Sequence, residues 1–521
     1  PCPRWRTTLD AGRSLDLRAT FAFATSRDEA LRLLRDTVDH AERRLEQAAD
    51  WYEKVWQAAF TPRNGIFSGW LPRLETDIEP LRRIYYMGAM TLITCRRSYP
   101  HAVKRPLYLT IWPRRGEGSS YLAWELPYVS APLVRLDPQA LKSEWQILAS
   151  APMLDYQVTN YFTGRHGGWG CSAHPQALIE SASRLLRFSG DRSILDETVL
   201  RQRRTTAGFE AASQGQIVDE GDAAGSDRPM TGAEVLAETY SLYDTLRMPG
   251  TPFIDFGGRG AYHECVTTYA HATAGMNAFF STALRDASLF GLPSRRADAD
   301  ALLKAVTSLY REEPASFDCR YPDGRLVSAP NLYDLGMVLT YLGAALPKSI
   351  TSSVYSFILD ELCTPTWAHN LWPLDPDIAS GIRADHQWAG CFPAWISQFA
   401  IGAAHSGVAD QRLSDWLTGV AEITRQGPFG QAYWAEDIHP PEEGAAAKCY
   451  DELTQGNHWV IGSGAHFVEA VIEGVCGVQV DETGRAVKTP GLPGWEDRCR
   501  LSGIRTAAGV FQYADSKCTE E

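Results

Sequence analysis

Apolar residues recur every three to four positions along most of the chain, which is the spacing of the buried face of an amphipathic helix. In the first such stretch, residues 28–60, one stripe is formed by Leu31, Leu34, Val38, Ala41, Leu45 and Ala48. The same spacing predicts further helices over residues 79–95, 137–149, 174–188, 192–211, 232–246, 264–290, 297–312, 332–346, 351–363, 387–404, 410–426 and 463–475. The pattern therefore predicts an all-α protein.

Strand-like alternation is confined to the two ends of the chain. It is found over residues 15–24 and again between 478 and 513, where Glu482-Thr483-Gly484 and Leu492-Pro493-Gly494 are turn signals. We expect small β elements at the N- and C-termini: a short β segment within residues 1–26 and a small β module over 478–521. Residues 27–477 lie between them as one helical unit.

The links between the predicted helices alternate in length. Short links lie at 189–191, 291–293, 346–348 and 406–408, whereas long connections span 96–136, 151–173, 248–263, 313–331, 364–386 and 427–462. Short links join antiparallel helix hairpins, so a closed ring of hairpins would carry all the long connections on one face. Gly, Trp, Tyr, His, Asp and Glu are concentrated in these connections, and we expect the functional site there.

Composition and charge exclude several classes of function. The 521 residues carry a net charge of -13, which argues against a broad nucleic-acid-binding surface. No run of about 20 apolar residues is present, so we expect a soluble protein without a membrane partner. The 11 cysteines form no CxxC pair, so neither a metal nor a cofactor is expected, and unpaired thiols favour the cytoplasm over a secreted or periplasmic location. The oligomeric state is not indicated.

Several local motifs resemble the six-hairpin, (α/α)6 glycosidase superfamily, which includes processing glucosidases, mannosylglycerate hydrolases and trehalases. Trp124-Glu125 resembles its early Trp–Asp loop at the sugar pocket, with Glu in place of Asp, and 187–191 resembles a hairpin turn. Residues 275–278, 383–390 and 492–495 resemble an inner helix, a substrate loop and the β cap. The motifs follow the superfamily's order across 28–478. The resemblance implies an (α/α)6 toroid and a glycoside hydrolase of carbohydrate metabolism, in which 15–24 would be a remnant of an N-terminal β-sandwich.

Glycoside hydrolysis generally needs two carboxylic groups, one of which protonates the leaving oxygen. Asp255 and Glu264 both qualify as this acid, because the resemblance places the acid in the loop that enters the inner helix containing Asn277. Asp255 lies between aromatic residues and glycines, which would favour its protonated form, whereas Glu264 lies in a first helical turn that would stabilise its anion. We favour Asp255 and keep Glu264 as its rival. A turn residue and a helix-terminal charge are the structural alternatives.

The resemblance also implies a base just ahead of the last inner helix. Glu436 matches this position best, Asp437 is second, and Asp451 and Glu452 are later options. Superfamily members whose acid and base are well separated mostly invert the anomeric centre, which implies carboxyl groups about 6.5–9.5 Å apart. We therefore predict an exo-acting, inverting enzyme.

The remaining candidates for sugar contact are aromatic, charged or imidazole side chains in the same connections, because flat rings with polar edges suit sugar rings. For Asp385 a helix N-cap is an equally good interpretation. The predicted substrate-binding residues are Trp124, Glu125, Asp155, Trp169, Arg259, Tyr333, Asp334, Asp385, His386, Trp388, Tyr433, Trp434, His458 and Trp459.

Two other functions fit the same helical ring. A sugar epimerase or polysaccharide lyase would use His, Tyr and Arg, for which His386, His458, Tyr433 and Arg259 are available. A carbohydrate-binding toroid without catalysis would need no paired carboxylates. All three alternatives have a carbohydrate as partner.

Overall fold

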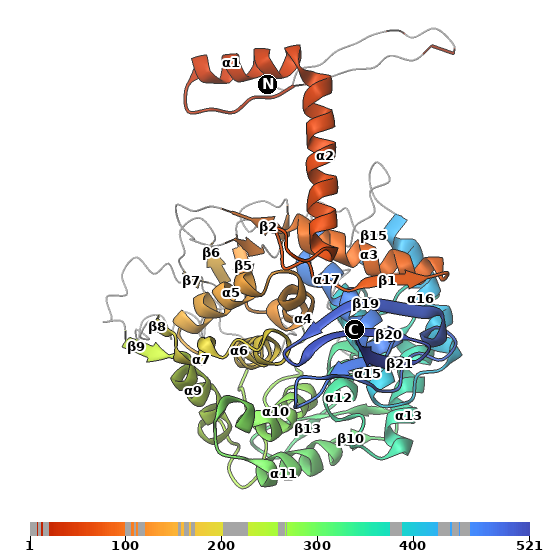
Figure 1. Ribbon diagram of the computed structural model, residues 1–521. Helices are drawn as coiled ribbons and strands as arrows, with labels where there is room; N and C mark the ends of the chain where they lie inside the picture. The colour runs from red at the N-terminus through yellow and green to blue at the C-terminus, as the bar shows by residue number, and fades with distance from the viewer. Residues whose placement is uncertain are drawn as a thin grey trace.

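The computed structural model describes residues 8, 12–13, 20–98, 106–108, 111–112, 120–154, 158–160, 166–167, 172–201, 228–258, 266, 268–375, 388–425, 438–439, 447–448 and 459–521. Most of these residues are helical, as the apolar spacing predicted (Figure 1). The body of the molecule is a thick layer of helices, with a small β-sheet against one side.

Two kinds of helix alternate along the described chain. Those of the first kind are buried on nearly all sides: α4 (Leu126–Leu136), α6 (Ala173–Arg184), α10 (Ala274–Asp286), α12 (Leu332–Leu342), α15 (Pro393–His405) and α17 (Ile461–Glu469). Those of the second kind bury one face: α3 (Glu79–Thr94), α5 (Pro138–Ser150), α9 (Gly232–Thr245), α11 (Arg296–Thr307), α13 (Lys348–Phe357) and α16 (Gln411–Glu422). From α3 to α17, the helices of these two lists alternate strictly. Each hairpin therefore pairs one helix that is buried on nearly all sides with one that buries a single face.

The buried helices pack side by side in the order α10, α12, α15, α17, α4 and α6. Helix α3, the first of the series, packs against α16 and α17, the last two. The beginning and end of the helical region are therefore joined. Short helical turns extend or follow several of these helices: η2 (Leu185–Ser189), η4 (Ala287–Phe290), η5 (Ile358–Leu362), η6 (Ile423–Arg425), η8 (Ala470–Val475) and η9 (Glu496–Arg498).

Helix α4 corrects the sequence prediction, which treated 96–136 as one long connection. The helix contains Pro132 and has Pro127 in its first turn, and every one of its residues is buried. A helix buried on all sides has no polar face, so it shows no apolar periodicity, and proline argues against a helix. The missing periodicity and the prolines both argued against a helix here. The helix forms nevertheless, because neighbouring helices stabilise α4.

Two other predicted helices are wrong in part. Residues 192–211 were expected to be helical, but α7 (Ser193–Asp196) is followed by strand β8 (Thr198–Arg201), which pairs with β9 (Arg228–Thr231). Residues 202–211 lie outside the described part. The helix predicted over 264–290 begins only at Ala274, where a carboxylate from α12 binds its first turn. In both cases tertiary partners decide the boundary.

The predicted helix over 28–60 is interrupted at His40, which separates α1 (Arg27–Asp39) from α2 (Ala41–Phe60). Helix α2 projects from the body and carries α1 at its far end (Figure 1). Residues 20–24 form no strand, so the predicted N-terminal strand is wrong over these residues. Only the end of α2 enters the core, through Ala58 and Ala59.

The predicted C-terminal β elements are confirmed. Strands β19 (Cys499–Thr506), β20 (Gly509–Ala514) and β21 (Lys517–Glu520) form an antiparallel meander, and β17 (Val478–Val480) pairs with β18 (Ala486–Lys488). Alternate residues of β19 are buried, as in a sheet with one face on the core. The sequence did not predict that β1 (Arg73–Thr76), from ahead of α3, completes the sheet, with Leu74 opposite Leu501.

Short strands occur within the long connections. Strand β16 pairs with β4, and β5, β6 and β7 form a three-stranded sheet, so connections far apart in sequence lie side by side. These strands are β2 (Arg96–Arg97), β3 (Leu107–Tyr108), β4 (Ile111–Trp112), β5 (Ser120–Leu122), β6 (Val158–Asn160), β7 (His166–Gly167), β10 (Tyr310–Arg311), β11 (Ser316–Phe317), β12 (Cys319–Arg320), β13 (Leu326–Val327), β14 (Ile438–His439), β15 (Ala447–Lys448) and β16 (Trp459–Val460).

Candidate functional site

The N-termini of the buried helices meet at one end of the helical body, which we call the loop end. A long connection precedes each of α4, α6, α10, α12, α15 and α17. First-turn residues of neighbouring buried helices touch one another: Tyr333 of α12 lies against Trp395 of α15, and Gly462 of α17 lies against Glu125, the N-cap of α4. The loop end therefore gathers residues from four helices that are far apart in sequence.

Aromatic rings line this end. The rings of Trp124 and Phe392 lie 4.7 Å apart, and those of Tyr333 and Trp395 lie 5.4 Å apart. The indole nitrogen of Trp395 donates a hydrogen bond to the Tyr128 hydroxyl at 3.0 Å. Aromatic pairs of this kind add stability beyond the area that they bury. Of the five rings, the sequence singled out only Trp124 and Tyr333.

Glu125 is the carboxylate nearest this aromatic cluster. It is only 3% exposed, and the absence of a side chain at Gly462 makes room for it. A Cβ atom built on Gly462 would lie 1.8 Å from Glu125 Oε2 and 3.5 Å from the Phe392 ring. The glycine is thus required by close packing at this point, and the start of α17 fixes the position of the Glu125 carboxylate.

Asp255, the favoured acid, has a more polar setting than its neighbours in the sequence suggested. Its Oδ1 accepts a hydrogen bond from the Gly257 backbone N–H at 2.7 Å and lies 3.0 Å from His271 Nδ1. His271 has a left-handed backbone, with φ of 66°, and its ring lies 4.4 Å from that of Tyr321. Such a conformation is uncommon outside glycine and marks a position held by its surroundings. The Asp255 carboxylate is therefore held by a backbone N–H and lies within hydrogen-bond distance of an imidazole nitrogen.

Asp334 has a structural task at the loop end. Its carboxylate accepts hydrogen bonds from the Gly275 N–H at 2.7 Å and the Tyr269 hydroxyl at 2.5 Å. The first of these caps α10, whose own N-cap residue, Thr273, makes no side-chain cap. Burial raises the pKa of Asp334 to about 6, despite the two hydrogen bonds, which lower it. Sugar contact by Asp334 stays a prediction.

The other described candidates are also packed closely. Tyr333 is fully buried, and its hydroxyl lies 3.7 Å from Met276 Sδ. Trp124 and Trp388 are 6% and 9% exposed, and Trp388 packs in a small apolar cluster with Val266 and Leu371. Their substrate contacts stay predictions.

The remaining predicted site residues lie outside the described residues or, for Trp459, have no described side chain. The backbone of Trp459 is in β16, opposite Trp112 of β4. The others are Asp155, Trp169, Arg259, Glu264, Asp385, His386, Tyr433, Trp434, Glu436 and His458. The acid and base assignments therefore rest on the sequence, and His271, which was not chosen as a site residue from the sequence, lies beside Asp255.

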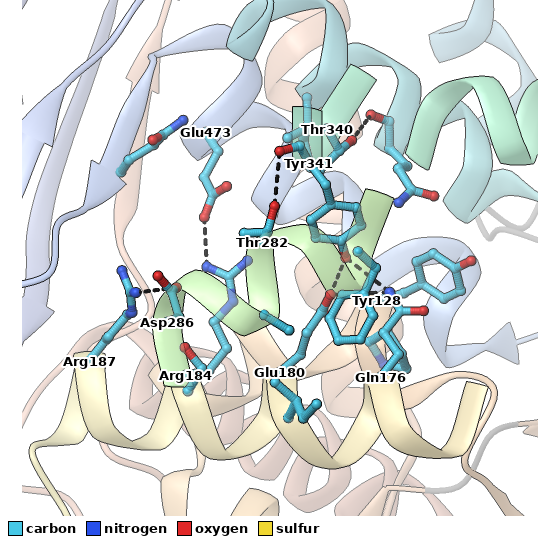
Figure 2. A pocket seen from close by; sticks show the side chains of 18 of the residues that line it. Tyr128, Gln176, Glu180, Arg184, Arg187, Thr282, Asp286, Thr340, Tyr341 and Glu473 are labelled. Atoms are coloured by element: carbon cyan, nitrogen blue, oxygen red, sulfur yellow. Dashed lines mark hydrogen bonds and ion pairs between the residues drawn. The ribbon is translucent and has the colours of Figure 1, made fainter. Parts of the chain in front are cut away.

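A second space opens inside the body, away from the loop end. It is a cavity of about 280 Å³ lined by α6, α10, α12, α15 and α17, mostly by the halves that follow their first turns. Figure 2 shows ion pairs and hydrogen bonds between its walls, including Arg184 with Glu473 and Arg187 with Asp286.

Two further classes of site were searched for in the described residues. No group of three or more His, Cys, Asp or Glu side chains among them has the arrangement of a metal site. None of the described helices combines the length and the apolar character needed to cross a bilayer.

The fold matches that of solved glycosidase structures. A structure named sialidase superposes with a TM-score of 0.58 and 12% identity over 89% of this chain and 41% of its own. A GH78-family rhamnosidase of Bacillus sp. GL1 superposes with a TM-score of 0.50 and 10% identity over 85% of this chain and 40% of its own. No family model matches the chain, and no characterised protein matches it in sequence. The resemblance to six-hairpin glycosidases is thereby confirmed as a likeness of fold, with proteins more than twice as long.

Proposed function

We propose that this chain is a glycoside hydrolase whose active site lies at the loop end. The observation that carries the proposal is the meeting of four buried-helix N-termini around an aromatic cluster with the buried Glu125 carboxylate. Aromatic faces bind the apolar sides of sugar rings, and a carboxylate among them offers hydrogen bonds to hydroxyl groups. The fold likeness to a sialidase and a rhamnosidase supports a carbohydrate as substrate.

We further propose that the helices from α3 to α17, within the predicted unit of residues 27–477, form a closed (α/α)6 ring, with α1 and α2 outside it. Support comes from the strict alternation of buried and one-faced helices and from the contact of α3 with α16 and α17. Helices α6 and α10 complete the inner ring across the cavity, where Arg187 beyond α6 pairs with Asp286 of α10 at 2.6 Å. In such a ring the long connections share one face, which is where the predicted acid and base lie in the sequence.

For the chemistry, we propose direct attack by water with inversion, and exo action. Glu436 would serve as base, with the acid drawn from Asp255 and Glu264. Asp255 is the favoured acid and Glu264 its rival; the Gly257 N–H and His271 would orient the Asp255 carboxylate. The aromatic and polar residues named from the sequence, including Trp124, Glu125 and Trp388, would hold the sugar.

The test is hydrolysis of a panel of aryl glycosides and disaccharides, with rhamnosides and sialosides included, and with product anomers followed by NMR. We expect Glu436→Gln, and one of Asp255→Asn and Glu264→Gln, to lower turnover about 10²- to 10⁴-fold, the usual contribution of a general acid or base. Asp300→Asn, on the outer helix α11 with a 62% exposed side chain, is the matched control. Near-normal turnover in Glu436→Gln, together with near-normal turnover in both Asp255→Asn and Glu264→Gln, would refute the assignment.

A further inference from the structure

The cavity inside the helical body has features of a second binding site. Its volume of about 280 Å³ is near the lower end of the roughly 300–1,000 Å³ of small-molecule sites. It fills the space between α6 and α10, the neighbouring buried helices that make few direct contacts, and it extends to Pro127 and Tyr128. Its wall near Gln479 and Val480 adjoins the C-terminal β elements. Tyr128 is shared with the aromatic cluster of the loop end, and most of the other lining residues lie further along the helices.

Four of the charged side chains that line the cavity form two ion pairs. Arg184 Nη1 lies 2.8 Å from Glu473 Oε1, and Arg187 Nη2 lies 2.6 Å from Asp286 Oδ2 (Figure 2). Burial alone would raise the pKa of Glu473, but Arg184 lowers it well below its usual range, so this pair is ionised. Each guanidinium is thus neutralised locally, and no surplus positive charge is left for an anion.

One wall offers hydroxyl, amide and carboxyl groups in a small space. Gln176 Nε2 donates to the Tyr341 hydroxyl at 2.9 Å and to Glu180 Oε1 at 3.1 Å, and the Tyr341 hydroxyl donates to the same Glu180 oxygen. Figure 2 shows these three side chains converging from α6 and α12. Side chains of this kind bind hydroxyl groups. Each of them can replace a hydrogen bond to its neighbour by a hydrogen bond to a ligand hydroxyl.

Another wall carries acceptors. Gln398 is 3% exposed, and its Oε1 has no hydrogen-bond partner within the described residues, although its Nε2 donates to Met337 Sδ. His466 Nδ1 lies 3.0 Å from the Ala394 carbonyl oxygen, which can only accept, so Nδ1 carries the hydrogen. Burial lowers the pKa of His466 to about 4, which leaves the ring neutral and Nε2 an acceptor. A buried acceptor without a partner is a place for a donor from a ligand.

The cavity also has an apolar side, to which Ile179, Phe279 and Phe290 contribute. Hydroxyl-binding groups opposite aromatic and aliphatic side chains are the usual composition of a sugar or polyol site. We propose that this cavity binds a small neutral polyhydroxy compound, of the size of one monosaccharide, at a site separate from the loop end. The argument uses the cavity alone, so it does not depend on the proposed hydrolase activity.

Saturation-transfer NMR on the full chain tests the proposal with three small probes: D-glucose, methyl phosphate as an anion and choline as a cation. We expect saturable signals from glucose alone. Gln398→Leu removes the acceptor without a partner and should weaken glucose binding about three- to tenfold, the effect of one hydrogen bond. Ser183→Phe places a ring at the cavity wall and should abolish binding, whereas Ser288→Phe, at an exposed position outside the cavity, should leave it unchanged.

Each other result overturns the proposal. Absence of a glucose signal refutes a polyol site, and stronger binding of methyl phosphate or choline refutes the neutral class. Glucose binding that survives both Gln398→Leu and Ser183→Phe, in protein with an unchanged circular dichroism spectrum, assigns the sugar to another surface. Hydrolysis is measured in a separate experiment from glucose binding. A failure of the cavity proposal can therefore be told apart from a failure of the hydrolase proposal.

Discussion

The two ends of the buried helices differ in the kind of contact that their side chains make. At the loop end the helices contribute rings and close backbone contacts, such as Trp124 on Phe392 and Gly462 under Glu125. At the opposite end, which we call the charged end, they contribute Arg135, Arg184, Glu469 and Glu473, paired within the body. The charged end precedes the short links and its charges are paired with one another, whereas the loop end follows the long connections, which contain the proposed acid and base.

The largest expected effect is at the charged end. The side chains of Arg135 and Glu469 are each 1% exposed and in direct contact. Arg135→Met should lower the free energy of unfolding by about 3–5 kcal/mol, because it strands a buried carboxylate. Urea unfolding measures this change. The double variant Arg135→Met with Glu469→Leu should recover most of the loss, and a double variant as unstable as the single one would contradict an ion-pair origin.

The second prediction concerns pH and the carboxylate that joins α12 to α10 at the loop end. The folded-state pKa of Asp334 is raised to about 6 from 3.8, so the folded chain holds the proton more tightly than the unfolded chain does. The stability from this group is complete below pH 3.8 and is lost as pH rises through 6. Relative to Asp334→Asn, the wild-type free energy of unfolding should fall by roughly 3 kcal/mol between pH 4 and 7. Parallel urea titrations that show a constant difference would disprove the shift.

A smaller effect is expected from a single methyl group at the loop end. In Gly462→Ala the new Cβ would lie 1.8 Å from Glu125 Oε2, so α17 or Glu125 must move. Overpacking of this kind costs about 1–3 kcal/mol, and we expect sugar hydrolysis to fall with it. Gly65→Ala is the control, since this glycine is exposed and a Cβ there meets no described atom within 4 Å. Equal stability and activity in the two variants would remove Glu125 from the proposed site.

The smallest effect is predicted for an exposed ion pair. It serves as the comparison for the buried pair of Arg135 and Glu469 in the first prediction. Arg412 contacts Asp360, and their side chains are 46% and 58% exposed. Arg412→Ala should change the free energy of unfolding by less than about 1 kcal/mol, because exposed pairs are screened by water and salt. A loss as large as that of Arg135→Met would show that burial is not what separates the two pairs.

The sequence indicated which connections would contain the proposed site. It did not indicate which side chains contact one another there. The alternation of short and long links led to the connections that do precede the buried helices. The setting of Asp255 did not follow from its neighbours, because His271 reaches it from 16 positions along the chain. Nor did Phe392 and Trp395 stand out, since an aromatic residue in a helix is ordinary core until its partners are known.

The sequence by itself determined the helical class, the positions of most one-faced helices and the C-terminal strands, because these depend on local periodicity and turn chemistry. Only the tertiary structure decided the existence of α4, the late start of α10 at Ala274 and the addition of β1 to the C-terminal sheet. The physical reason is common to all three. A helix buried on every side has no polar face to record its period, and a helix start or a strand that depends on Asp334 or on β19 is stabilised by partners that no local window contains.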